Sequence, residues 1–186
     1  MCYLQLLPSF SNIYKETIYG DLSAQILGIM AGAGGIGALS GTAVTNRLKA
    51  KFNLGKLVLG SNVLSVIFLF LFGVSNLFVF ESNVYENPWL SYNLILSVIL
   101  IIITGFLNSI FMVGAMSLLQ LNVPEILRGR VMGIHTITFS LMSAGALFLG
   151  ILAEIFSSSV AVILASGSLI FINFLIYTKN SDIRKI

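Results

Sequence analysis

Long stretches without a single charged residue dominate this sequence and restrict what it can form. Crossing the roughly 30 Å hydrocarbon core of a bilayer takes about 20 apolar residues in a helix. We predict five such spans, at residues 22–46, 57–80, 94–119, 131–153 and 156–178. Only 9% of the residues are charged and 57% are hydrophobic, whereas about 25% charged residues is usual for a soluble domain. This composition excludes a soluble globular domain, a cytosolic enzyme and a disordered chain, and it predicts a polytopic membrane protein.

The spans are predicted to be helices. Backbone polar groups in hydrocarbon must pair internally, so only helices or a closed barrel can cross. Barrel strands alternate polar and apolar residues, but the run LILSVILIIIT at 94–104 does not. A single helix over 131–178 would be about 72 Å long, too long for a bilayer, so we place a tight turn near Glu154 and the serines at 157–159. The predicted fold class is therefore an all-α membrane helix bundle.

The basic residues indicate an orientation. With five spans, nine of the ten lysines and arginines fall on one side. Those nine are Arg47, Lys49, Lys51, Lys56, Arg128, Arg130, Lys179, Arg184 and Lys185. Because Lys and Arg accumulate in cytoplasmic loops, we expect a multi-pass protein of the plasma (inner) membrane with a cytoplasmic carboxyl terminus.

The amino-terminal residues 1–10, MCYLQLLPSF, are apolar but would form a helix only about 15 Å long. We interpret them as the remnant of a preceding span, and the chain as an amino-terminally truncated piece of a longer protein.

The first span is rich in glycine and contains two GxxxG pairs, Gly28/Gly32 and Gly37/Gly41. Small residues at this spacing allow two membrane helices to approach closely. We therefore predict that these four glycines serve helix packing. The alternative is that glycine is simply common in membrane helices.

Two loop sequences resemble those of the major facilitator superfamily. The segment GALSGTAVTNRLKAK at 37–51 is similar to its glycine-rich and basic loop motif, although Thr45 or Asn46 fills the acidic position. The segment LLQLNVPEILRGRVMG at 118–133 resembles the loop between helices ten and eleven in the branch of enterobactin-exporter-like and macrolide-efflux-like proteins, and Leu6-Leu7-Pro8 matches the end of its helix seven. The resemblance implies the carboxyl-terminal half of such a transporter, from the end of helix seven through helices eight to twelve.

This resemblance implies secondary active efflux of small amphipathic molecules or siderophore-like compounds by alternating access. The loop residues that correspond to its cytoplasmic motifs are Arg47, Lys49, Lys51, Glu125, Arg128, Gly129 and Arg130. The arginines could pair with Glu125 or another acid to close the cytoplasmic side, or they could simply anchor the loops at lipid phosphate. Pro124 suits the first position of the next helix because its missing N–H needs no partner there.

Few side chains inside the spans could contact a substrate. The candidates are Gln25, Thr104, Asn108, Met112, His135 and Phe139. His135 is the one ionisable residue well inside an apolar run, where such residues are often functional. The resemblance implies that helices ten and eleven line the cavity, which favours Asn108, Met112, His135 and Phe139. The alternatives are ordinary helix packing for the stripe from Thr104 to Met116, and an interfacial hydrogen bond for His135.

The sequence does not support catalysis, because its lone histidine has no orienting carboxylate nearby. It predicts no metal site, no cofactor and no nucleic-acid partner. The expected partners are the lipid bilayer, a small-molecule substrate, and either an amino-terminal half transporter or a second copy. The alternative is an inactive fragment, or a membrane packing or regulatory module that does not transport.

Overall fold

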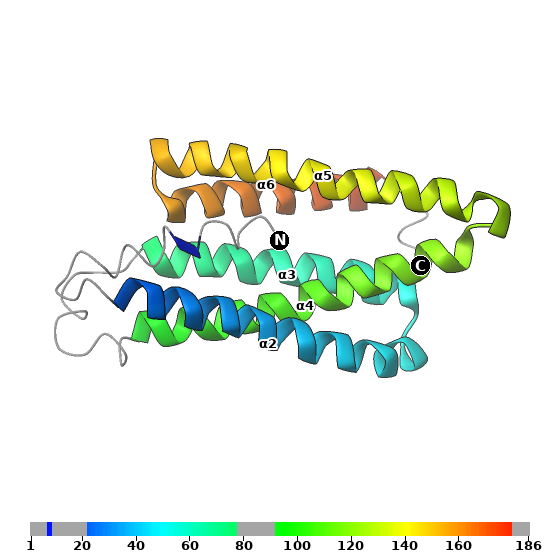
Figure 1. The fold of residues 1–186 in the computed structure, drawn as a ribbon, viewed down its shortest axis with the longest axis horizontal. Helices are drawn as coiled ribbons and strands as arrows, with labels where there is room; N and C mark the ends of the chain where they lie inside the picture. Colours follow the sequence, from blue (N-terminus) through cyan, green and yellow to red (C-terminus); the bar gives the residue numbers. More distant parts are fainter. Residues whose placement is uncertain (1–6, 9–21, 78–91, 180–186) are drawn as a thin grey trace.

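The computed structural model describes residues 7–8, 22–77 and 92–179, and the regular structure in these ranges is helical. Five long helices follow one another (Figure 1): α2 (Leu22–Lys51), α3 (Leu54–Leu77), α4 (Tyr92–Asn122), α5 (Glu125–Ile155) and α6 (Ser158–Lys179). All five are long and apolar enough to cross a membrane. The predicted all-α membrane bundle is thus confirmed. Of the predicted remnant at 1–10, only Leu7 and Pro8 lie among the described residues; both are helical, and Leu7 is buried in the core.

Short connections join α2 to α3, α4 to α5 and α5 to α6, at sites that carry turn residues. Between α2 and α3, the Gly55 backbone N–H donates to Asn53 Oδ1 at 3.1 Å. Between α5 and α6, the Val160 N–H donates to Ser157 Oγ at 3.3 Å. Serine and asparagine oxygens commonly satisfy the free N–H groups of a first helical turn. Pro124 is the residue before α5, with φ −55° and ψ 147°. Our prediction of a helical Pro124 was wrong by one position, because its extended ψ lets the chain turn before the helix begins.

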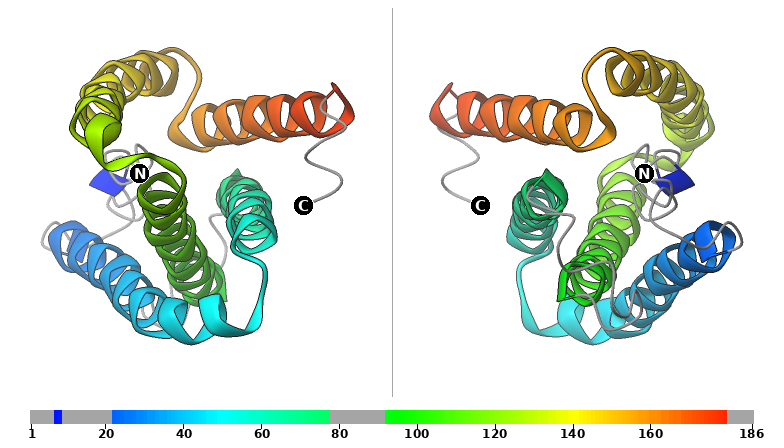
Figure 2. Two further views of the ribbon diagram at one scale, coloured as in Figure 1. Left: turned by 90° about the vertical axis from the view of Figure 1, so that its right-hand side faces the viewer. Right: turned by 90° about the vertical axis from the view of Figure 1, so that its left-hand side faces the viewer.

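The helices form two layers (Figures 1 and 2). One layer holds α2, α3 and α4, and the other holds α5 and α6. The core joins the two layers near the end where α5 leads into α6: Ile26, Met30, Phe72, Ile101 and Val162 are all buried there. Between the layers, α3 packs on α6, and Asn62 Nδ2 donates to Asn173 Oδ1 at 3.1 Å.

Helix α5 is the least buried helix of the bundle. It packs chiefly against α6, and none of its described side chains is buried. In the end-on views of Figure 2, it lies at the margin of its layer, away from the compact group of α2, α3 and α4. One flank of α5 therefore remains available to lipid or to another helix.

Glycines bring α2 and α4 into backbone contact. A Cβ atom on Gly37 would collide with the backbone carbonyl of Ile102, and one on Gly41 with that of Phe106. A Cβ on Gly105 would lie 2.7 Å from the Gly34 carbonyl oxygen. Only residues without a side chain permit this approach. Gly28 and Gly32, the other pair singled out in the sequence, have no described atom within 4 Å of such a Cβ, so that pair is not part of this contact.

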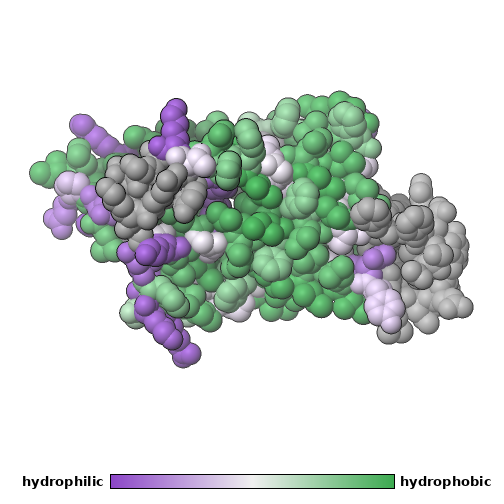
Figure 3. Space-filling model, turned by 180° about the vertical axis from the view of Figure 1, so that it is seen from behind, coloured by the Kyte–Doolittle hydropathy of each residue, from purple (hydrophilic) through white to green (hydrophobic). Residues whose placement is uncertain are grey.

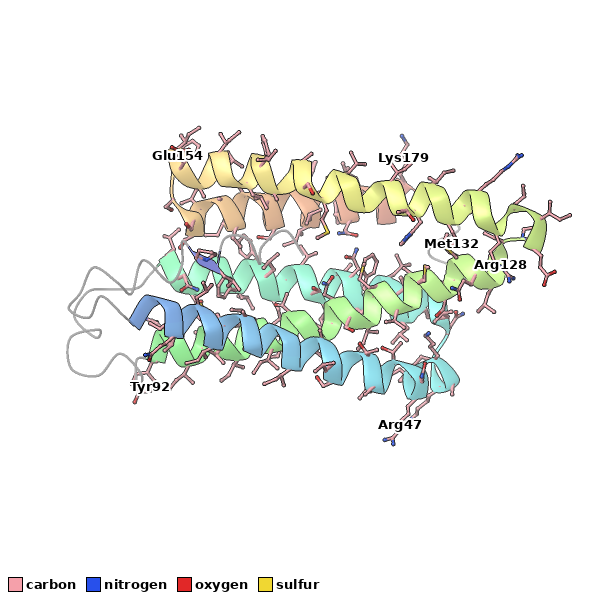
Figure 4. The ribbon with its side chains drawn as sticks, viewed as in Figure 1. Arg47, Tyr92, Arg128, Met132, Glu154 and Lys179 are labelled. Carbon is pink, nitrogen blue, oxygen red and sulfur yellow. The ribbon has the colours of Figure 1, made fainter. Side chains whose placement is uncertain are left out.

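Hydrophilic side chains gather at one end of the bundle, and apolar ones cover its middle (Figure 3). Figure 4 places Arg47, Arg128 and Lys179 in the same half of the molecule, and Tyr92 and Glu154 at the opposite end. We call the end with the α2–α3 and α4–α5 connections the basic end. The fold thus brings the described basic side chains to one end, as predicted from the sequence for nine of the ten lysines and arginines.

Candidate substrate cleft at the basic end

A cleft of about 520 Å³ lies between α4 and α5 toward the basic end. Small-molecule sites typically have volumes of about 300–1,000 Å³, so its size suits a small organic ligand. From α4 the lining residues are Met112, Val113, Met116, Ser117 and Gln120, and from α5 they are Met132, His135 and Thr136.

The spacing of these residues follows the helix period. Met112, Met116 and Gln120 recur every four residues along one side of α4, and Met132, His135 and Thr136 stand at i, i+3 and i+4 on α5. Residues three and four apart lie on the same face of a helix. The lining residues of α4 and those of α5 therefore each form one face of a regular helix, and these two faces border the cleft.

The lining combines an adaptable apolar surface with a few polar groups. Three methionines contribute flexible, polarisable side chains, which can adjust to ligands of different shape. Ser117, Gln120, His135 and Thr136 add groups that can hydrogen-bond a ligand. This combination is suited to holding an amphipathic molecule.

A basic residue of the first loop motif reaches the wall of the cleft. Lys49 Nζ of α2 donates to Ser117 Oγ of α4 at 2.5 Å. The Ser117 hydroxyl in turn donates to the Val113 carbonyl at 2.8 Å. Two turns earlier, Thr42 Oγ1 and Ser109 Oγ share a hydrogen bond of 2.7 Å. These bonds continue the α2–α4 contact from the glycines to the basic end and fix Lys49 beside the cleft.

The second loop motif also touches the cleft, through Arg128. Its Nη2 donates to the backbone carbonyl of Gln120 at 3.4 Å. Within the described part of the chain, Arg128 has no ion pair with Glu125. Glu125, Gly129 and Arg130 are exposed. An ion pair of Arg128 with an acidic residue that closes the cytoplasmic side therefore stays a prediction. What the structure shows for Arg128 is a hydrogen bond that connects the start of α5 to the end of α4.

The basic residues of the first loop motif differ in exposure. Arg47 and Lys51 are exposed, whereas Lys49 is half-buried. Among the basic residues of the first motif, Lys49 is thus the one that the fold holds against a neighbouring helix.

The candidate cavity residues separate into two groups. Met112 and His135 line the cleft together. Thr104 is 2% exposed, and its hydroxyl has no hydrogen-bond partner among the described residues. Asn108 is half-buried but is not among the lining residues. Gln25 is exposed near the opposite end of α2. For Phe139 the structure describes the helical backbone only, so its side chain lies outside the description.

Several lining residues were not among the candidates chosen from the sequence: Val113, Met116, Ser117, Gln120, Met132 and Thr136. Met116 is the last residue of the stripe that begins at Thr104, and Gln120 continues its four-residue spacing, which was a usable signal. Met132 and Thr136 flank His135 on the same face of α5, which was a second signal. Nothing in the sequence indicated that Lys49 would reach Ser117.

Comparison with known families identifies the kind of protein. The family of major facilitator type described as transmembrane secretion effector matches residues 3–185, which is nearly the whole chain. Comparison with curated proteins and comparison with solved structures each gave no significant match. The family is one of membrane transporters rather than enzymes. The five membrane-spanning helices and the extent of this match together show that the chain belongs to the transmembrane secretion effector family of the major facilitator transporters.

Proposed function

We propose that this chain is the carboxyl-terminal half of an efflux transporter of the enterobactin-exporter-like and macrolide-efflux-like branch. It exports small amphipathic molecules or siderophore-like compounds across the plasma membrane by alternating access. The observation that carries the proposal is the methionine-lined cleft between α4 and α5, which opens near the basic end. The motif around Arg128, which contacts one edge of this cleft, supports the choice of branch.

The cleft needs a further wall to enclose a substrate. Among the described residues its lining comes from α4 and α5, and ligand sites usually bury about 70–90% of a small ligand. The exposed flank of α5 is the surface on which another half can close. We propose that an amino-terminal half transporter, or a second copy of this chain, supplies that wall.

Blocking the cleft tests the proposal. Met116→Trp places a bulky ring in the lining, whereas Leu121→Trp makes a comparable change at a side chain that is 76% exposed and outside the cleft. Efflux of the fluorescent dyes ethidium and Nile red would be measured in cells that express the chain with its amino-terminal half. We expect Met116→Trp to reduce efflux by about tenfold or more, the size of effect that one apolar pocket contact can have on specificity. Leu121→Trp is expected to leave efflux unchanged.

The same assay distinguishes efflux from the alternative, in which the chain is an inactive fragment or a membrane module that does not transport. Dye accumulation that is unchanged by a stable complex of the two halves would support that alternative. Equal effects of Met116→Trp and Leu121→Trp would show that transport does not use this cleft.

A further inference from the structure

A second hollow, of about 360 Å³, lies where the end of α2 and the start of α3 meet α4. It shares no residue with the substrate cleft. Its lining residues are Leu48 and Phe52 at the end of α2, Lys56, Leu57, Gly60, Ser61 and Leu64 of α3, and Phe106, Leu107 and Ile110 of α4. We call it the α3 hollow.

The chemistry of the α3 hollow is hydrocarbon with a single cation. All its lining residues are apolar except Lys56 and Ser61. The Ser61 hydroxyl donates to the Val58 carbonyl of its own helix at 3.1 Å, so it offers little to a ligand. Gly60 leaves part of the space open, because no described atom lies within 4 Å of a Cβ built there. A ligand that fits must therefore be apolar along most of its length and anionic at one end.

The dimensions match one leaflet of a bilayer. Lys56 lies in the first turns of α3 at the basic end, and Leu64 lies eight residues further along, a rise of about 12 Å. Half of the hydrocarbon core is about 15 Å thick. The hollow thus runs from the level of the lipid headgroups toward the middle of the membrane.

The cross-section indicates a single hydrocarbon chain rather than a helix. A volume of 360 Å³ spread over a length of about 12 Å leaves a mean cross-section of roughly 30 Å². A helix with its side chains is about 10–12 Å across and would need at least roughly 80 Å². A lipid acyl chain is narrow and flexible enough to enter, whereas a protein helix is too wide.

Charge at the mouth of the hollow selects the headgroup. The sequence from Arg47 to Leu64 contains no Asp or Glu. Arg47, Lys51 and Lys56 are all exposed at this end. The first turn of α3 has no acidic residue either, so the positive end of this helix is not neutralised. Lys56 is the one cation among the lining residues, and a phosphate beside it is favoured.

We propose that the α3 hollow binds one acyl chain of an anionic phospholipid, whose phosphate pairs with Lys56. The site is independent of the transported substrate. It would hold the ends of α2 and α3 to α4 at the basic end, next to the contact between Lys49 and Ser117.

Native mass spectrometry of the full chain, purified in detergent, tests this site. The probes are dioleoyl phosphatidylglycerol, which is anionic, and dioleoyl phosphatidylethanolamine, which is zwitterionic. We expect the chain to retain the anionic lipid about fivefold better, the factor expected for one basic residue at an anionic surface. Lys56→Gln is expected to remove this preference. Lys51→Gln removes the same charge from an exposed residue outside the lining and is expected to keep it. Equal losses in the two variants would overturn the proposal in favour of a diffuse charge effect.

The acyl chain is tested by filling the hollow. Gly60→Leu puts a side chain into the open space, and Gly150→Leu makes the same change on the exposed side of α5. We expect Gly60→Leu to weaken retention of both lipids and Gly150→Leu to weaken neither. Unchanged retention in Gly60→Leu would overturn the proposal.

A measurement on the unaltered chain covers the case in which Gly60→Leu does not fold. Dibutyryl phosphatidylglycerol carries the same headgroup on very short chains and is expected to bind far more weakly than the dioleoyl lipid. Equal binding would show that the hollow is not used. A lipid-free dimer that excludes both lipids would mean that a second copy covers this surface, and would also overturn the proposal.

Discussion

Thr104 is a polar residue in the buried part of α4. Its side chain is 2% exposed in α4, and its hydroxyl has no hydrogen-bond partner among the described residues. A buried hydroxyl without a partner costs free energy relative to an apolar group of the same shape. We therefore predict that Thr104→Val raises the free energy of unfolding by about 1 kcal/mol, measured as a higher midpoint of thermal unfolding in detergent.

Thr45 provides a matched control for this substitution. It is fully buried in α2, but its hydroxyl donates to the Gly41 carbonyl at 2.6 Å. Thr45→Val removes that bond and is expected to lower the midpoint. An equal fall in both variants would mean that Thr104 does have a partner in the membrane.

The position of Thr104 also shows why the cavity could be predicted only in part. Residues at a spacing of four drift by about 40° per step around a helix, because each residue turns it by about 100°. The row that begins at Thr104 therefore turns from the helix interface at its start to the cleft at Met112, Met116 and Gln120. The sequence displays the row, but which part of it faces a cavity depends on where α5 lies.

At the scale of helices, the close contact of α2 with α4 depends on glycines of both helices, Gly37 and Gly41 of α2 and Gly105 of α4. A Cβ on Gly41 would collide with the backbone of Phe106, and backbone cannot move aside as a flexible side chain can. We predict that Gly41→Ala destabilises the bundle by about 1–3 kcal/mol, the usual cost of overpacking. The shift would also separate Lys49 from Ser117. Thermal unfolding in detergent measures the stability.

Gly28→Ala is the control for Gly41→Ala, since a Cβ at Gly28 meets open space among the described residues. It is expected to leave stability unchanged or slightly raised, because alanine favours helix more than glycine does. If Gly28→Ala proved as harmful as Gly41→Ala, the α2–α4 contact would not be the reason for either effect.

The two GxxxG pairs illustrate what the sequence could and could not specify. Gly28 and Gly37 are nine residues apart, which is two and a half turns of a helix, so the two pairs lie on opposite sides of α2. One neighbouring helix can contact only one pair. The sequence predicted close packing, but the choice of Gly37/Gly41 follows from α4 packing on that side. Helix number and length were easier to predict, since the bilayer dictates them.

For the whole molecule, the distribution of charge predicts the orientation in the membrane. The described basic residues of the loops lie toward the basic end, whereas Glu154 lies at the opposite end (Figure 4). Cytoplasmic loops carry an excess of Lys and Arg, and nine of the ten such residues belong to the loops on this side. The basic end should therefore face the cytoplasm.

Cysteine labelling in intact cells tests this orientation. After Cys2→Ser, single cysteines replace exposed residues at the basic end, Lys51 and Lys179, and at the other end, Tyr92 and Glu154. A maleimide that cannot cross membranes should label Tyr92→Cys and Glu154→Cys at once, but Lys51→Cys and Lys179→Cys only after permeabilisation. Replacing one lysine by cysteine leaves eight of the nine basic residues on this side, so each variant should keep the orientation of the unaltered chain. Labelling of Lys51→Cys and Glu154→Cys from the same side would contradict five crossings, and the reverse pattern would place the substrate cleft on the outer face.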